Sequence, residues 1–174
     1  MKYLLSITLL FFSLTEYGLA QNDVFEQEVL KCIQSNGTYD YYENFVDKTF
    51  ESYLANRSGN TIPDEVLNDL KQESMDELSH YLISIYRKHF VLQDVKNMYA
   101  LYTSKAGRKM LFKPEGLNAK ERSELSQFYT SKTGQKIKAS QNDMNAAMKQ
   151  ILQIWARDFD TEIRNDLAQR GFEF

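Results

Sequence analysis

The sequence predicts an all-α protein: a single-domain bundle of five to seven helices. Apolar residues recur at steps of three and four along most of the chain, which is the period of an amphipathic helix, and no alternating run typical of a strand occurs. The 174 residues include only 7 Gly and 2 Pro, and 43% are hydrophobic. The chain therefore has few helix breakers and enough apolar mass for one core.

Helix-ending signals separate the periodic runs. Gly37 closes the first run, and Gly171 follows the last, as expected of a glycine just past a helix end. Pro63 stands at the expected first position of a central helix. We expect Trp155, on the last stripe, to be buried against the repeat described below. The apolar stripes cover residues 24–33, 41–54, 67–85 and 144–167.

The first 20 residues have the layout of a secretory signal peptide. Lys2 supplies a positive start, residues 3–14 form an apolar stretch too short for a typical membrane span, and Gly18 and Ala20 place small residues before a cleavage site. We therefore expect residues 1–20 to be removed and the mature domain, residues 21–174, not to span the membrane. This predicts export, with an uncleaved anchor as the alternative.

An internal repeat is the most informative feature of the chain. Residues 101–110 read LYTSKAGRKM and residues 128–137 read FYTSKTGQKI, with six of ten positions identical. The correspondence continues upstream, where Asp94 matches Glu121. Each copy is expected to form a helix–kink–helix unit, over about residues 90–113 and 117–140. Asn118 and Glu121 form a candidate capping box in the second copy, whereas the first has Val91 in place of Asn118.

The motif residues are candidates for structural roles at the two kinks. The serines are expected to cap the second helix of each unit, and the glycines to permit close helix packing or a kink. The tyrosines are expected near the corners, and the lysines largely in solvent. The alternative is a pair of anion sites built from serine hydroxyls, helix-start amides and lysines. These residues are Tyr102, Ser104, Gly107 and Lys109 in the first copy and Tyr129, Ser131, Gly134 and Lys136 in the second.

The repeat carries a resemblance to a known family. Residues 128–136 read FYTSKTGQK and residues 101–109 read LYTSKAGRK. Both resemble the motif F-Y-x-S-P-x-G-x-K of the exported bacterial family called domain of unknown function 2059, and the likeness covers about residues 80–140. Lys105 and Lys132 stand where that family favours proline. The resemblance implies an all-helical domain in the periplasm of a Gram-negative bacterium, or a secreted one, and it implies no established activity.

Charge is distributed unevenly along the chain. Residues 21–100 have a net charge of −7, residues 101–138 of +6 and residues 139–174 of −2. The basic segment either pairs with the acidic helices of the same fold or faces an anionic partner. The expected partner is therefore an unknown protein or an anionic envelope component. Export and the overall charge of −3 argue against nucleic acid.

The sequence contains no motif that predicts catalysis. His80 and His89 lie nine residues apart, on opposite faces of one expected helix, and Glu77 with His80 forms a single Glu-x-x-His where a di-iron bundle needs two. We therefore predict no catalytic, cofactor-binding or metal-binding residues. Cys32 is expected to be a buried, inert thiol.

Two functions of different classes follow. The first is a non-enzymatic exported protein that binds another protein in the cell envelope, which an exposed apolar surface would support. The alternative is a binder of a small apolar ligand or lipid, which a cavity between the helices would support. A hydrolase would instead need Ser, His and a carboxylate within hydrogen-bonding reach.

Overall fold

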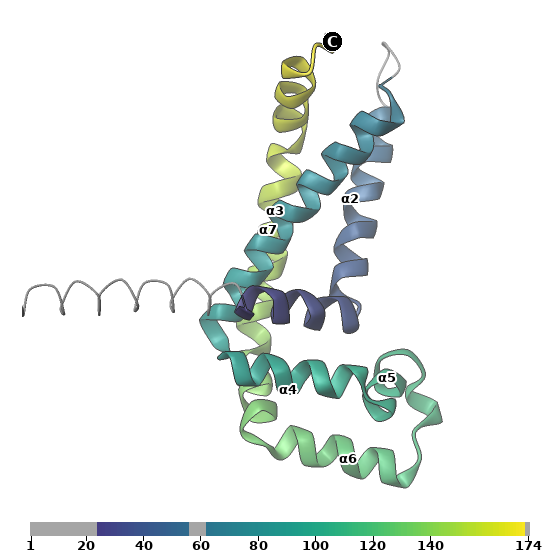
Figure 1. Ribbon diagram of the computed structural model, residues 1–174, viewed down its shortest axis with the longest axis vertical. Coiled ribbons are helices and arrows are strands. Elements are labelled where there is room, and N and C mark those ends of the chain that lie inside the picture. Colours follow the sequence, from purple (N-terminus) through teal and green to yellow (C-terminus); the bar gives the residue numbers. More distant parts are fainter. Residues whose placement is uncertain (1–23, 56–61, 173–174) are drawn as a thin grey trace, which may run out of the picture.

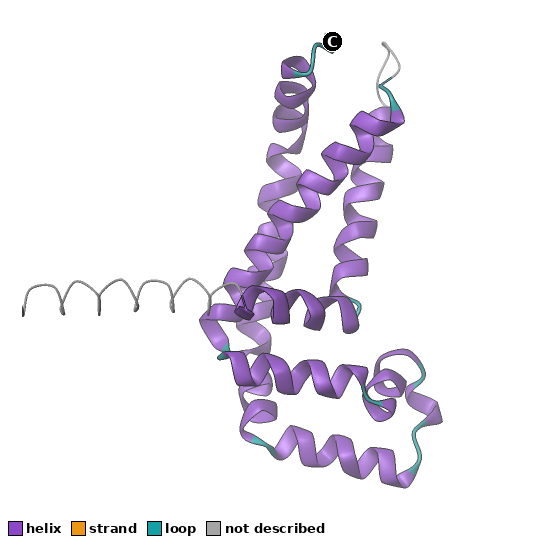
Figure 2. Ribbon diagram, viewed as in Figure 1, coloured by secondary structure: helices purple, strands orange, loops and turns teal. Residues whose placement is uncertain are grey.

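A computed structural model describes residues 24–55 and 62–172 (Figures 1 and 2). Within these ranges the chain is helical, with short connections and no strand, so the all-α prediction is confirmed. The expected signal peptide lies outside the described residues. Beyond the helical residues 24–35, the elements are α2 (Thr38–Ala55), α3 (Asp64–His89), α4 (Leu92–Thr103), α5 (Lys105–Phe112), the 3-10 helix η1 (Pro114–Gly116), α6 (Ala119–Thr130) and α7 (Lys132–Gln169).

Three helices form an elongated arm: α2, α3 and the C-terminal part of α7 (Figure 1). Its core combines aliphatic side chains with a cluster of aromatic rings. The rings of Phe50 on α2 and Phe159 on α7 meet edge to face, with centroids 4.9 Å apart, and Phe50 is completely buried. Burying rings and aliphatic side chains of this size is the main stabilising contribution available to a helical bundle.

Trp155 belongs to this aromatic core. It is 4% exposed, and its ring neighbours are Phe45 of α2 and Phe159 of α7. The expectation that it packs against the repeat is wrong. At about 1.5 Å of rise per residue, roughly 30 Å of helix separates it from Gly134. Helix α7 is 38 residues long and contains neither Gly nor Pro after Gly134, so the expected unit 117–140 does not end but continues into the arm.

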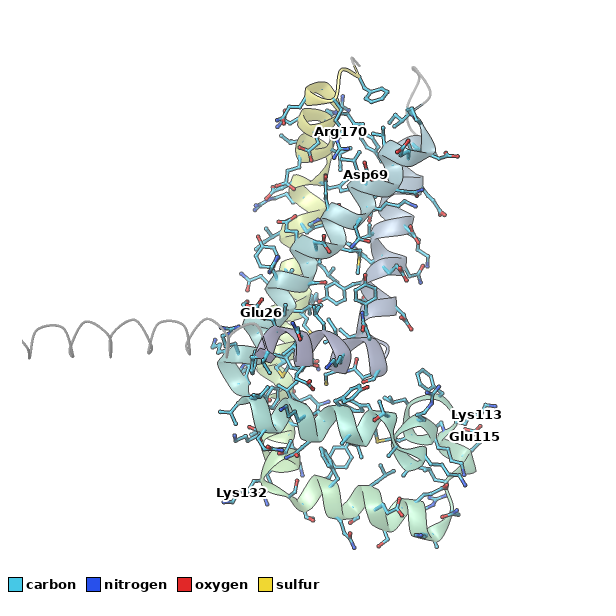
Figure 3. All side chains as sticks on the ribbon, in the orientation of Figure 1. Glu26, Asp69, Lys113, Glu115, Lys132 and Arg170 are labelled. Atoms are coloured by element: carbon cyan, nitrogen blue, oxygen red, sulfur yellow. The ribbon has the colours of Figure 1, made fainter. Side chains whose placement is uncertain are left out.

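The start of α3 and the end of α7 show local sequence signals. Pro63 is the N-cap residue of α3, one position before its expected place. Gly171 adopts a positive φ of 85°, and the Phe172 N–H donates to the Leu167 carbonyl at 2.9 Å. This is the bonding pattern of a Schellman motif. Arg170 then contacts Asp69 and Glu73 of α3 at the far end of the arm (Figure 3).

The helical residues 24–35 cross the base of the arm and are followed by a turn at Gly37, whose φ is 81° (Figure 1). Below them lies the repeat region, made of α4, α5, η1, α6 and the start of α7. Helices α4 and α6 run in opposite directions, with α5 at their outer end (Figure 1). The small core of this region contains only Leu101, Ala106 and Leu125 as buried apolar residues.

Candidate functional site: the repeat corners and the junction groove

The two copies of the motif build two similar helix corners. Ser104 is the N-cap residue of α5, and its Oγ accepts a hydrogen bond from the Gly107 N–H at 3.0 Å. Ser131 is the N-cap residue of α7, and its Oγ accepts from the Gly134 N–H at 3.2 Å. Each serine thus satisfies one of the amide groups that a helix start leaves without a partner.

Both glycines lie where the new helix touches the end of the preceding one. A Cβ atom on Gly107 would lie 1.9 Å from the carbonyl oxygen of Leu101, and one on Gly134 would lie 2.3 Å from that of Phe128. These distances are far below van der Waals contact, and neither glycine has a positive φ. The requirement for glycine is therefore one of space at the corner rather than of backbone conformation.

Both motif lysines are engaged in ion pairs. Lys109 is half-buried, which differs from the expectation of a solvated side chain, whereas Lys136 is exposed as expected. Lys109 Nζ donates to Glu121 Oε2 at 2.8 Å and to the Gly116 carbonyl at 3.0 Å. Lys136 donates to Asp94. Both acidic residues are almost completely buried, since Glu121 is 4% exposed and Asp94 is 5% exposed. Each lysine therefore pairs with the acidic residue of the other copy. We call Lys109–Glu121 and Lys136–Asp94 the crossed pairs.

Each acidic residue of a crossed pair also caps its own helix. The carboxylate of Asp94 accepts from the Val91 N–H at 3.2 Å and from the Thr133 hydroxyl at 2.8 Å. Burial alone would raise the pKa of Asp94, but hydrogen bonds from Lys136, Thr133 and Val91 outweigh it and leave this pKa below its ordinary value.

The second copy contains the expected capping box. Asn118 Oδ1 accepts from the Glu121 N–H at 2.9 Å, and Glu121 Oε2 accepts from the Asn118 N–H at 2.9 Å. The pKa of Glu121 is lowered, chiefly by the hydrogen bond from Lys109 and then by that from the Asn118 N–H. The sequence identified Asp94 and Glu121 as equivalent positions, but not their pairing across the copies.

The two motif tyrosines meet at one concave surface, which we call the junction groove. It lies where the repeat region joins the arm and has a volume of about 320 Å³. Five helices contribute to it: α2, α3, α4, α6 and α7. Its lining residues are Thr38, Tyr86, Phe90, Met98, Tyr102, Tyr129, Ile137, Gln141, Met144, Asn145 and Met148.

The junction groove is lined by apolar and neutral polar side chains, without a charged one. A second concavity of about 560 Å³ adjoins it, because both are lined by Thr38, Asn145 and Met148. Tyr129 stands exposed at the groove, with its hydroxyl donating to Met110 Sδ at 3.4 Å, and Tyr41 stands exposed at the adjoining section. Together they form a surface of apolar side chains and hydrogen-bonding groups that is open to solvent, with one charged side chain, Lys149, in the adjoining section.

A buried polar cluster lies beside the junction groove. Asn36 hydrogen-bonds to the hydroxyls of both Tyr86 and Tyr102, and Tyr86 also contacts Cys32. Burial raises the pKa of Cys32 to about 12 and raises the pKa of Tyr86 and of Tyr102 as well. These thiol and phenol groups therefore keep their protons at neutral pH, which is the opposite of what an activated nucleophile requires.

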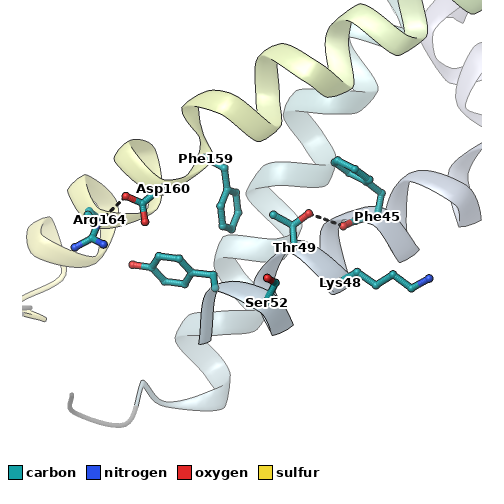
Figure 4. Close-up of a pocket in the computed structure, with 8 residues that line it drawn as sticks. Phe45, Lys48, Thr49, Ser52, Phe159, Asp160 and Arg164 are labelled. Atoms are coloured by element: carbon teal, nitrogen blue, oxygen red, sulfur yellow. Dashed lines mark hydrogen bonds and ion pairs between the residues drawn. The ribbon is translucent and has the colours of Figure 1, made fainter. Parts of the chain in front are cut away.

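A further concavity of about 560 Å³ lies between α2 and α7 in the arm (Figure 4). Three of its polar side chains are engaged with neighbours. The Thr49 hydroxyl donates to the Phe45 carbonyl at 2.8 Å, and Arg164 pairs with Asp160 at 2.9 Å. The pocket offers an aromatic floor but no converging set of polar groups.

The two histidines lie apart on α3. His80 is exposed on α3 and His89 lies at its last turn, and no group of three or more potential metal ligands occurs in the described part of the chain. No helix within residues 24–55 and 62–172 is both long and apolar enough to cross a membrane.

Comparison with protein families gives one match. Residues 115–161 match domain of unknown function 2059, a family described as an uncharacterized protein conserved in bacteria. The matched segment covers α6 and most of α7, and so includes the second motif copy but not the first. The resemblance is therefore shown for a shorter and later segment than residues 80–140. Comparisons with curated proteins and with solved structures give no match.

Proposed function

We propose that this is an exported, non-enzymatic binding protein of the bacterial cell envelope, which takes up an apolar segment of a partner protein in the junction groove. The observation that carries the proposal is the convergence of five helices on one uncharged, aromatic- and Met-lined groove. Both motif tyrosines contribute to it, and Tyr129 lies within the segment that matches the bacterial family, whereas Tyr102 lies before that segment.

Export rests on the N-terminal sequence. Residues 1–20 carry the positive start, the apolar stretch and the small residues of a cleavable signal. N-terminal sequencing of the protein recovered from the producing cell tests this. Cleavage after Ala20 is expected, and a chain that still begins at Met1 contradicts it.

The chemistry of the groove favours binding over catalysis. Its lining has neutral hydrogen-bonding groups from Thr38, Gln141 and Asn145 among apolar side chains, which suits a segment with apolar side chains and a polar backbone. The raised pKa of Cys32 and of the buried phenols supports the non-enzymatic role.

A small apolar ligand or lipid is the second candidate. The junction groove, at about 320 Å³, falls within the size range of small-ligand sites. Its open shape and its continuation into the adjoining section favour an elongated occupant. A partner segment fits these features better than an enclosed small molecule does.

Site-specific photo-crosslinking in the producing cells tests the proposal. A crosslinking amino acid replaces Tyr129, which is 39% exposed at the groove, and in separate cells Tyr41, which is 61% exposed at the adjoining section. Tyr81, which is 43% exposed on α3, is replaced in the same way as the matched control. The same protein product from Tyr129 and from Tyr41, absent from Tyr81 and lost when Met148→Lys is added, is expected. A lipid product would favour the second candidate, and equal products from Tyr129 and Tyr81 would contradict both.

A further inference from the structure

The outer end of the repeat region carries a strong positive charge. Between residues 105 and 122 the chain has six basic and two acidic side chains, a net charge of +4. Lys109 is held by Glu121 in a crossed pair. Lys105 lies 3.9 Å from the same carboxylate but is 81% exposed, so it counts with the remaining cations of this surface. We call it the basic tip: the exposed side chains Lys105, Arg108, Lys113, Lys120 and Arg122.

An exposed aromatic ring stands within the basic tip. Phe112, the last residue of α5, is 59% exposed. Lys105, Arg108 and Phe112 are spaced three and four residues apart and therefore share one face of α5. Large apolar side chains surrounded by cations are typical of surfaces that lie in the interface of an anionic membrane, where the ring enters the headgroup layer and the cations contact lipid phosphates.

We propose that the basic tip docks onto an anionic lipid bilayer, with Phe112 inserted between the headgroups. The corner geometry supports this, because Lys109 ties α5 to Glu121 and to the Gly116 carbonyl. Helix α5 is thereby held against α6 with Phe112 facing outward. The ring is thus presented by a fixed element and needs no rearrangement to meet a surface.

The charge of the arm sets the orientation. The first fourteen residues of α3, Asp64–Glu77, contain six acidic side chains and one lysine. In Figure 3, Asp69 lies toward the far end of the arm, whereas Lys113 and Glu115 lie at the outer end of the repeat region. An anionic surface attracts the tip and repels this part of the arm, so the arm extends away from the bilayer.

Phe112 distinguishes a bilayer from a soluble polyanion. A polyanionic glycan or an acidic protein would be held by the cations, and an isolated exposed ring adds little to such binding. A bilayer gains from both, because the ring leaves water on insertion. The proposal rests on export, and it is independent of the junction groove.

Vesicle co-sedimentation of the purified mature protein tests the proposal. Binding is expected to vesicles of phosphatidylglycerol and phosphatidylcholine, to weaken as salt is added, and to be absent with phosphatidylcholine alone. Each cation near an anionic surface strengthens binding about fivefold, so Arg108→Gln with Lys113→Gln and Lys120→Gln should weaken it roughly 100-fold. Phe112→Ser should weaken it about tenfold.

Matched controls separate the tip from general charge and apolarity. The triple variant Lys48→Gln, Lys88→Gln, Lys96→Gln removes the same charge from exposed positions elsewhere, and Ile154→Ser removes an apolar side chain that is 42% exposed on the arm. Both should bind like the unchanged protein. Failure to sediment with anionic vesicles overturns the proposal. The proposal is also overturned if the Phe112→Ser variant binds anionic vesicles normally and soluble polyphosphate competes with the vesicles. That result would indicate a polyanion site. Neither result affects crosslinking at Tyr129.

Discussion

The arm and the repeat region are both helical, but different interactions stabilise them. In the arm, large apolar side chains such as Phe50, Leu78 and Leu167 are almost completely removed from water. The repeat region buries only Leu101, Ala106 and Leu125 in its own core. Apart from Val95 and Met98 of α4, which are buried in the main core, its helices are fixed by capping serines, close glycine contacts and the crossed pairs. A thin helical layer that cannot build a large core can therefore be stabilised by contacts at its helix corners.

Truncating one core residue in each region gives the largest expected difference. Phe50→Ala should lower the free energy of unfolding by about 3–5 kcal/mol, because it leaves a cavity at a fully buried ring. Leu125→Ala, at a residue 8% exposed, should cost about 2 kcal/mol. Urea denaturation measures both. A larger loss for Leu125→Ala would mean that the arm is not the main source of stability.

The corners should be the most sensitive part of the repeat region. Gly107→Ala and Gly134→Ala should each cost about 2–3 kcal/mol, because the new methyl group would meet backbone atoms that cannot move aside without shifting a helix. Gly116→Ala is the control, since nothing lies within 4 Å of its added Cβ atom. It should change stability by less than about 0.5 kcal/mol. If Gly107→Ala and Gly134→Ala melt like Gly116→Ala, the corners have room for a methyl group and the close-packing account is wrong.

How well the sequence predicted these regions depends on the range of the interactions involved. The caps at Ser104 and Ser131 and the helix end at Gly171 are local, so residue type and spacing were enough to indicate them. The pairing of Lys136 with Asp94 joins residues 42 positions apart, and a charge count cannot show which carboxylate a lysine meets.

The junction groove and the place of Trp155 were beyond sequence reasoning for a related cause. Both depend on α7 running unbroken from the second corner into the arm. The absence of Gly and Pro between Gly134 and Gly171 was a usable signal for that continuity. The meeting of five helices at one groove, by contrast, follows from tertiary packing, which periodicity does not specify.

Double-mutant cycles can test whether the pairs are truly crossed. Lys136→Gln should cost about 1–2 kcal/mol, because it leaves the buried Asp94 carboxylate short of a donor, while the half-exposed lysine limits the loss. Lys136→Gln and Asp94→Asn should couple by at least about 0.5 kcal/mol. Lys109→Gln and Asp94→Asn, within one copy, should be additive within about 0.3–0.5 kcal/mol. Coupling within the copy instead would contradict the crossed arrangement.

Acid should act on the two regions in opposite directions, with the smallest effects of the series. Because the folded-state pKa of Asp94 is lowered, its contribution is present at neutral pH and is lost as the pH falls below the ordinary value of 3.8. On the arm, burial and then the nearby Glu77, Asp158 and Asp166 raise the pKa of Glu162 above 4.5, so its ionised form destabilises the fold until acid protonates it.

Urea melts at neutral pH should therefore find Glu162→Gln more stable than the unchanged protein and Asp94→Asn less stable. Both differences should shrink below pH 3.8, since protonation then removes the charge that each substitution removes. An Asp94→Asn deficit that persists in acid would show that Asp94 acts through packing, and that the repeat region depends on its charged pairs less than the corner geometry indicates.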